Sequence, residues 1–223
     1  VKLELIQQFT LSNKRNLLIT LHFLRHYPTN TMGAAFWKLH QAQYYAQIVW
    51  KVIPLLFEHL HLSDLSKRTQ QPQFTKAFKN MLVIVDATEF PIRPPRDSWS
   101  SQKMYFSNKK KHHALKYQIV VRTNDGVILN VYGPFPCTVH DKAVFDDWFE
   151  QQSSNFEEAE IIGGDKGYVG HSKILVPFKK NQIAEEWQKT FNVVFGSIRV
   201  IVEQAIGRIK RFKVLQDKWR HAR

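Results

Sequence analysis

Three acidic residues occupy positions from which they could act together on a phosphate ester. Asp86 ends the apolar run MLVIVD, and Asp165 ends a second apolar run, IIGGD. Glu203 lies in IRVIVEQAIGRIK, one position round from an apolar helical stripe. If the two runs are neighbouring strands, their carboxyl ends share one edge of a sheet, which is where open sheets bind ligands. A helix packed across that edge would bring Glu203 within reach of both aspartates.

This arrangement predicts a site for divalent metal ions. Converging carboxylates repel one another, so their assembly needs a neutralising cation. Ligand sets made only of oxygen favour Mg²⁺ or Mn²⁺. Two such ions, about 3.5–4 Å apart, could activate a water molecule and stabilise the leaving oxygen of a phosphodiester. We therefore expect Asp86, Asp165 and Glu203 to be catalytic residues that hold two ions, with no side chain required as general base.

Each acid also has a simpler interpretation. Asp165 begins DKG, a sequence typical of a turn in which the aspartate bonds its own backbone. Glu203 could pair with Arg199 one helical turn earlier, a contact worth about 0.3–0.5 kcal/mol. Asp141, which opens a predicted helix and could cap it, is a further candidate metal ligand.

The composition favours a polyanionic partner. Lysine and arginine number 32 against 19 acidic residues, so the net charge is +13, which indicates nucleic acid first and a membrane surface second. No run approaches the roughly 18 apolar residues of a membrane span, and no signal peptide is recognisable, so we predict no membrane partner. Cys137 stands alone, which excludes an intrachain disulfide and fits a reducing compartment.

Two groups of basic residues could hold a DNA backbone over the acids. One is the run that follows the first predicted strand, and the other belongs to the last predicted helix; contacts of this kind fix position rather than read bases. The predicted DNA-binding residues are Lys109, Lys110, Lys111, His112, Lys116, Arg199, Arg208, Lys210 and Arg211. We expect the Trp and Tyr side chains to pack in the core rather than stack on bases.

The chain divides by pattern into two parts. Residues 1–65 show helical spacing and two helices joined near Lys38–His40, which predicts a small all-α region of helix-turn-helix type. A helical bundle that only packs on the next domain is the alternative. The polar, proline-containing stretch within 66–80 predicts a linker, and 81–223 predicts one domain.

The second part alternates strand and helix patterns. A buried strand at 81–85 is followed by a hairpin around Asn124-Asp125-Gly126 and an amphipathic helix over 140–152. Two more short strands and a long helix over 195–215, with Phe212 on its apolar stripe, complete the pattern. This order predicts an α/β fold with a mixed sheet flanked by helices.

Several blocks resemble the DDE-superfamily endonucleases and transposases that include the PIF/Harbinger elements. They cover most of residues 81–215 and read VDATEFPIRPP, YFSNKKKHHALKYQIVV, VILNVYGPFPCTVHDKAVF, GGDKGY and IRVIVEQAIGRIKRFKVL. LLITLHFLRHYPTN and the two helices after it resemble, more loosely, the helix-turn-helix module ahead of the catalytic domain in this group. Ala87 stands where a glycine commonly follows the first aspartate of the family.

The resemblance implies an RNase H-like fold and a metal-binding triad at Asp86, Asp165 and Glu203. It implies metal-dependent cleavage of DNA and strand transfer, with DNA as partner and a second copy or an accessory DNA-binding protein as a further partner. The alternative is a catalytically inactive or domesticated DNA-binding protein derived from a transposase. The expected location is the nucleus in a eukaryotic host and the cytoplasm otherwise.

Overall fold

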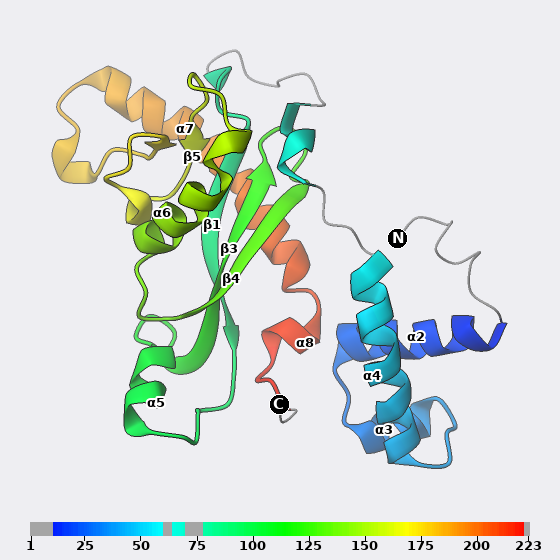
Figure 1. Ribbon diagram of the computed structural model, residues 1–223. Coiled ribbons are helices and arrows are strands. Elements are labelled where there is room, and N and C mark those ends of the chain that lie inside the picture. The colour runs from blue at the N-terminus through cyan, green and yellow to red at the C-terminus, as the bar shows by residue number, and fades with distance from the viewer. Residues whose placement is uncertain (1–10, 60–63, 70–77, 221–223) are drawn as a thin grey trace. The chain divides into compact units, whose positions relative to one another are not determined.

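The computed structural model describes residues 11–59, 64–69 and 78–220, and these form two compact units (Figure 1). The helical unit comprises Val1–His61 together with Lys210–Trp219, and the sheet unit comprises Leu62–Ile209 with Arg220–Arg223. The segment Lys210–Trp219, which we expected in the nuclease domain, groups with the helical unit.

The predicted linker over 66–80 is described only at its two ends. Its first residues lie in the 3-10 helix η1 (Leu65–Thr69), and residues 70–77 are outside the described residues. Leu65 packs in a core cluster of the sheet unit, and the Arg68 guanidinium forms a buried ion pair with Glu160 at 2.8 Å. The described start of this stretch is therefore part of the sheet unit rather than a free connection.

The helical unit contains α2 (Leu11–His26), α3 (Asn30–Phe36), α4 (Ala42–His59) and the short α8 (Lys213–Gln216). Its core includes Phe23, Tyr45 and Val214, so the segment after the last long helix completes a core that the first sixty residues begin. Lys38 lies in the turn between α3 and α4 with φ of 51°, the left-handed conformation that a glycine adopts more easily.

In its described residues, the sheet unit has six strands and three helices of more than one turn. The strands are β1 (Val83–Pro91), β2 (Phe106–Ser107), β3 (His112–Arg122), β4 (Ile128–Pro136), β5 (Ile162–Gly163) and β6 (Ile174–Leu175). The helices are α5 (Trp99–Tyr105), α6 (Asp141–Gln152) and α7 (Glu186–Ile209), with short 3-10 turns at η3 (Ser153–Asn155), η4 (Lys166–Tyr168) and η5 (Lys180–Gln182).

The sheet is mixed, as the sequence predicted. Strand β3 pairs antiparallel with β1, β2 and β4, whereas β1 pairs parallel with β5, and β5 parallel with β6. The predicted hairpin joins β3 to β4, and Gly126 in its turn has φ of 69°. An α/β sheet flanked by helices and preceded by an all-helical region is consistent with the expected RNase H-like fold.

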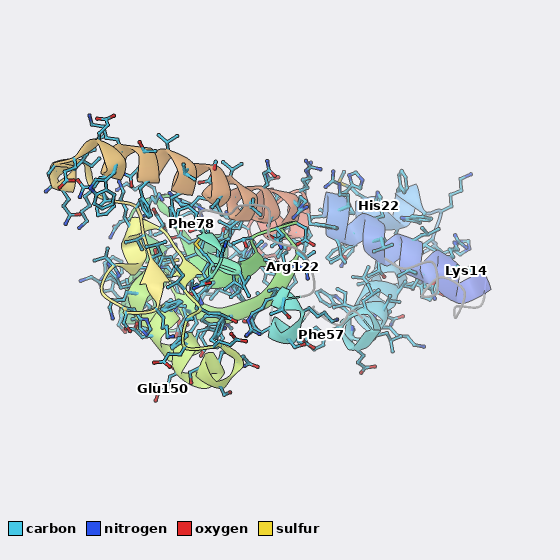
Figure 2. The ribbon with its side chains drawn as sticks, turned by 90° about the horizontal axis from the view of Figure 1, so that it is seen from above. Lys14, His22, Phe57, Phe78, Arg122 and Glu150 are labelled. Atoms are coloured by element: carbon cyan, nitrogen blue, oxygen red, sulfur yellow. The ribbon has the colours of Figure 1, made fainter. Side chains whose placement is uncertain are left out.

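Helices α6 and α7 cover opposite faces of this sheet (Figure 2). On the α6 face, Val85 and Val120 pack with Phe145 and Trp148 of the helix. On the α7 face, alternate strand residues such as Ile84 meet the apolar stripe of α7. Because both faces are covered, β1 reads as a continuous apolar run rather than an alternating one.

Helix α7 begins earlier and ends earlier than the sequence indicated. It ends at Ile209, and Phe212 is the N-terminal cap residue of α8 rather than a member of the α7 stripe. Lys210 and Arg211, which we expected on the last helix, therefore follow its end. Beyond this end the chain joins the helical unit, where Arg25 donates to the Arg211 carbonyl at 2.6 Å.

Among the described helices, none is both long enough and apolar enough to cross a membrane.

Candidate active site

The glycines of IIGGD allow β5 to lie closely against its neighbours. A Cβ atom at Gly163 would stand 2.8 Å from the Met81 sulfur, and one at Gly164 would stand 2.8 Å from the Ile174 side chain. Both distances are shorter than real Cβ contacts, so a larger residue would push the strand away. The two glycines therefore allow β5 to pack closely on its neighbours, and this packing fixes the position from which Asp165 follows the strand.

The parallel register of β1 and β5 brings the two aspartates together. Ile84 is opposite Gly163 in the parallel ladder, and Asp86 and Asp165 each follow this pair by two residues, Asp165 just beyond the end of β5. Neighbouring strands are spaced about 4.8 Å apart. The alternation of β1 places Asp86 on the same face as Ile84, which is the face that α7 covers.

Asp86 is a largely buried carboxyl group with little compensation. Its pKa is raised from 3.8 to about 6, mainly by burial and also by the Asp165 and Asp141 carboxylates. The Ala87 N–H, which donates to its Oδ1 atom at 2.8 Å, and the Arg199 guanidinium act in the opposite direction. Ionisation of Asp86 is therefore less favourable than in water, and a cation next to it would favour the ionised form.

The Asp165 side chain does not serve the turn in which it lies. Asp165 precedes η4 as its N-terminal cap residue, yet its carboxylate makes no capping hydrogen bond. The turn is closed instead by the Tyr168 N–H, which donates to the Asp165 carbonyl at 3.0 Å. Its carboxylate, 44% exposed, faces Arg199, so the simple turn interpretation does not account for this acid.

Arg199 connects the second and third acids. Its Nη1 atom lies 3.3 Å from Asp165 Oδ1, and its Nη2 atom lies 3.4 Å from Glu203 Oε1. Glu203 follows the buried Val202 on α7, so packing of the helix stripe presents Glu203 at the edge of the sheet. The sequence suggested the Arg199–Glu203 pair, but not that the same guanidinium also contacts Asp165, because that contact spans 34 residues.

Asp141 lies next to this group but is already engaged. The Lys116 ammonium donates to Asp141 Oδ1 at 2.8 Å and to the Val139 carbonyl at 2.6 Å. A Cβ atom at Gly167 would stand 3.1 Å from Asp141 Oδ2, so the glycine of DKGY makes room for this carboxylate. Asp141 is therefore near the site as an ion-paired side chain.

The predicted DNA-binding residues fall into three classes. Lys109, Lys110 and Lys111 are exposed, with Lys110 at 3.9 Å from the Glu89 carboxylate. Lys116 is buried against Asp141, and His112 is half-buried at the start of β3, so neither is an open phosphate contact in this structure. The remaining members belong to α7 or follow it: Arg199 faces the acids, Arg208 donates to the Gly126 carbonyl at 2.6 Å, and Lys210 and Arg211 lie beyond the helix.

Sequence analysis did not identify Tyr168 as a buried member of the site. Its ring is fully buried beside Phe145, and its hydroxyl has no hydrogen-bond partner in the described structure. Burial, together with the carboxylates of Asp141, Asp86 and Asp165, raises its pKa well above 10. The sequence does contain a signal for this residue. Tyr168 is an aromatic residue three positions after Asp165, where a buried ring can anchor the turn.

The three acids have the donor chemistry of a magnesium site, but their present arrangement is not that of a metal centre. Within 11–59, 64–69 and 78–220, no three His, Cys, Asp or Glu side chains are grouped closely enough to hold an ion. Arg199 instead contacts two of the acids, and the cost of burying the Asp86 charge outweighs the interactions that stabilise it. Hard carboxylate oxygens suit Mg²⁺ or Mn²⁺, so the residues fit such ions provided that Arg199 withdraws.

Comparison with known proteins gives two matches. A family described as DDE superfamily endonuclease matches residues 85–223. A probable transposase for insertion sequence element IS702 of Microchaete diplosiphon is 29% identical over 208 residues, which is 85% of this chain and 71% of that protein. No solved structure matches the chain significantly.

Replacement of Asp86 by Asn should stabilise the metal-free protein near neutral pH. The folded state holds the Asp86 proton more tightly than the unfolded state does, because the pKa is about 6 rather than 3.8. The free energy of unfolding therefore falls as pH rises through this window, and Asn removes that loss, a gain of about 3 kcal/mol.

Urea unfolding in EDTA at pH 7.5 and at pH 4 measures this effect. We expect the gain of Asp86→Asn at pH 7.5 to shrink at pH 4, whereas Glu150→Gln, at an exposed position on α6, should change little at either pH. Equal stability of Asp86→Asn and the wild type at pH 7.5 would contradict the raised pKa.

Proposed function

Since this chain belongs to the DDE superfamily of endonucleases, we propose that it is a transposase-type enzyme that cleaves DNA phosphodiester bonds and joins the freed strands through a two-metal site at Asp86, Asp165 and Glu203. The observation that carries this proposal is that acids from β1, from the turn after β5 and from α7 are each linked to the Arg199 guanidinium. Asp165 and Glu203 share the Arg199 guanidinium, and the same group acts on the pKa of Asp86. Such a grouping of like charges is costly unless a function requires it.

In the proposed reaction these residues hold and orient the metal ions and do not transfer protons. Asp86 on β1 and Asp165, in the turn that follows the neighbouring β5, would provide two ligands, and Glu203 would approach from α7. Bound Mg²⁺ or Mn²⁺ ions supply an activated water and neutralise charge on the leaving oxygen. Asp86 would be held ionised by the ions, since its raised pKa in the metal-free protein results from burial without a neighbouring cation in direct contact.

The excess of positive charge would hold the substrate. A net charge of +13 and the exposed run Lys109–Lys111 suit contacts with the phosphate backbone, which are independent of sequence and weaken with salt. Arg199 would be free to contact DNA once the acids bind metal. A second copy of the chain or an accessory DNA-binding protein remains part of the proposal, as does assignment to the PIF/Harbinger subgroup. The site of action would be the nucleus in a eukaryotic host and the cytoplasm otherwise.

Asp165→Asn and Glu203→Gln should each abolish cleavage while leaving DNA binding intact. Loss of a carboxylate ligand should reduce nicking of supercoiled plasmid in Mg²⁺ or Mn²⁺ by more than about a hundredfold. Glu186→Gln, at the opposite end of α7, is the matched control and should nick normally. Binding is compared in EDTA, where no cleavage occurs. If the wild type binds DNA but does not nick it with either ion, the competing function, a catalytically inactive or domesticated DNA-binding protein, is supported instead.

Arg199→Ala should increase the response of the protein to magnesium. Without the guanidinium, the metal-free acids lose a counter-charge, and a divalent ion then relieves more repulsion on binding. We expect a lower melting temperature than the wild type in EDTA and a larger rise, by a few degrees, on titration with MgCl₂. Lys189→Ala on the same helix removes an exposed ion pair and should leave the magnesium response unchanged. An identical response in Arg199→Ala would show that Arg199 does not compete with the ion.

We also propose that the helical unit binds duplex DNA. Its helices α3 and α4 are joined by a short turn, and a hollow beside this turn is lined by Arg15, Lys38, His40, Tyr44 and Gln47, among others. The exposed side chains at the start of α4 include amides and a phenol that can bond base edges, while the flanking cations suit phosphates. A helical bundle without DNA contacts is the competing interpretation.

Selection from a random duplex pool tests this proposal in the full-length chain. The wild type should enrich a sequence motif, and Gln43→Ala combined with Gln47→Ala should lose or relax the enrichment. Glu58→Gln, at an exposed position near the other end of α4, is the control and should select the same motif as the wild type. Identical motifs from the wild type and the double variant would exclude base reading by α4.

A further inference from the structure

The segment between β1 and β3 carries an aromatic ring that the fold does not use. This segment, here called the α5 arm, comprises residues 93–111. Its helix α5 has no buried residue, and the Trp99 side chain is 80% exposed. We expected the Trp side chains to pack in the core, as Trp148 does, and Trp99 does not. An indole left in water costs the protein solubility without adding to the stability of the core.

The α5 arm is held in place rather than loosely attached. Ser98 caps α5 by accepting from the Ser101 N–H at 3.1 Å, and the Gln102 amide donates to the Pro95 carbonyl at 3.0 Å. At the other end of the helix, the Thr138 N–H and hydroxyl both donate to the Met104 carbonyl at 3.2 Å. The exposed Trp99 side chain therefore lies on a helix that is held by hydrogen bonds at both ends.

The α5 arm also carries exposed cations. Five basic side chains of the α5 arm are exposed, and in the described part of the chain their charged groups form no ion pair. They are Arg93, Arg96, Lys103, Lys109 and Lys111. The acid of the arm, Asp97, accepts a hydrogen bond from the Ser101 hydroxyl at 2.7 Å. The arm therefore combines an open aromatic face with a strongly positive surround, which is the composition of a single-strand nucleic-acid platform.

The α5 arm is connected directly to the acids. Strand β1 runs from Asp86 to Pro91, five residues or about 17 Å, and continues into the arm. Figure 1 shows α5 beyond the carboxyl end of β1, at the end of the sheet toward which the active-site edge of β5 also points. A DNA strand lying over the acids would reach the arm within a few nucleotides.

We propose that the α5 arm binds a single-stranded stretch of DNA beside the cleavage site, with the Trp99 indole stacked on an unpaired base. A ring this exposed can cover the face of a base only if that base is unstacked, because a duplex hides its base faces. The neighbouring cations bind the phosphates on either side of that base. This inference rests on the proposed function for its substrate class, DNA, but not on cleavage.

Equilibrium binding of a fluorescein-labelled oligothymidylate to the full-length protein in EDTA tests the inference. Trp99→Ala should weaken binding about tenfold, the loss of one stacked base, without changing the salt dependence. Trp99→Phe keeps an aromatic face and should retain most of the affinity. Trp187→Ala is the matched control, since Trp187 is also exposed, at 55%, but lies at the start of α7 against Phe178. Circular dichroism and melting curves confirm that each variant is folded.

The cations should affect the salt dependence of oligothymidylate binding. Lys103→Ala combined with Lys109→Ala and Lys111→Ala should lower the slope of log affinity against log salt by about two, since each single-strand phosphate contact contributes about 0.7. Trp99→Ala should leave that slope unchanged. Together the two results distinguish the contribution of base stacking by Trp99 from the contribution of the lysine charges.

Three outcomes overturn the inference: Trp99→Ala binds the oligothymidylate as the wild type does, Trp187→Ala loses as much affinity, or the wild type shows no measurable binding. The proposed nuclease activity is judged separately, by plasmid nicking. A wild type that nicks plasmid while Trp99→Ala binds normally leaves the nuclease standing and removes the role of Trp99. A wild type that never nicks, with binding lost in Trp99→Ala, leaves the platform standing and removes the nuclease.

Discussion

The structure of the candidate site depends on carboxylates that repel one another, Asp86 with Asp165 and Asp141, beside the Arg199 guanidinium. Asp86 lies on β1, Asp165 follows the neighbouring strand β5, and Glu203 is presented by α7, which covers the same face. In the metal-free protein the repulsion is reduced by Arg199, which contacts Asp165 and Glu203, and by retention of the Asp86 proton to a pKa of about 6. In the proposed enzyme, divalent cations would take over this role from Arg199 and the proton.

The rest of the sheet unit fixes this edge by packing from both sides. On one face Val202 and its neighbours on α7 set the position of Glu203, and on the other Tyr168 anchors the turn that follows Asp165. Glycines at 163 and 164 allow β5 to approach, and Gly167 leaves room for Asp141. Asp141 is in turn held by Lys116, a buried ion pair that is expensive to break once formed. Rigid ligands on packed elements are what a site of this kind requires.

The chain passes directly from the last long helix of the sheet unit into the helical unit. Helix α7 carries Glu203 and ends at Ile209, and the residues that follow it enter the core of the helical unit through Val214. Trp219 stacks on Tyr27 in the same unit. The helical unit is therefore incomplete without the end of the chain, so removal of the C-terminal segment would damage the unit formed by the first sixty residues.

The sequence by itself determined the types and order of the main strands and helices, although not α5 or β2, and the catalytic role of the three acids stays its prediction. Apolar periodicity and the Asn124-Asp125-Gly126 turn are local signals, and local signals predict strands, hairpins and helices. Only the tertiary structure decided which cation lies between the acids, that Lys116 is buried rather than open to phosphate, that α7 stops at Ile209, and that Trp99 faces water. Each of these depends on neighbours that the fold brings from distant parts of the chain, and one sequence pattern cannot specify which partner a long charged or aromatic side chain will meet.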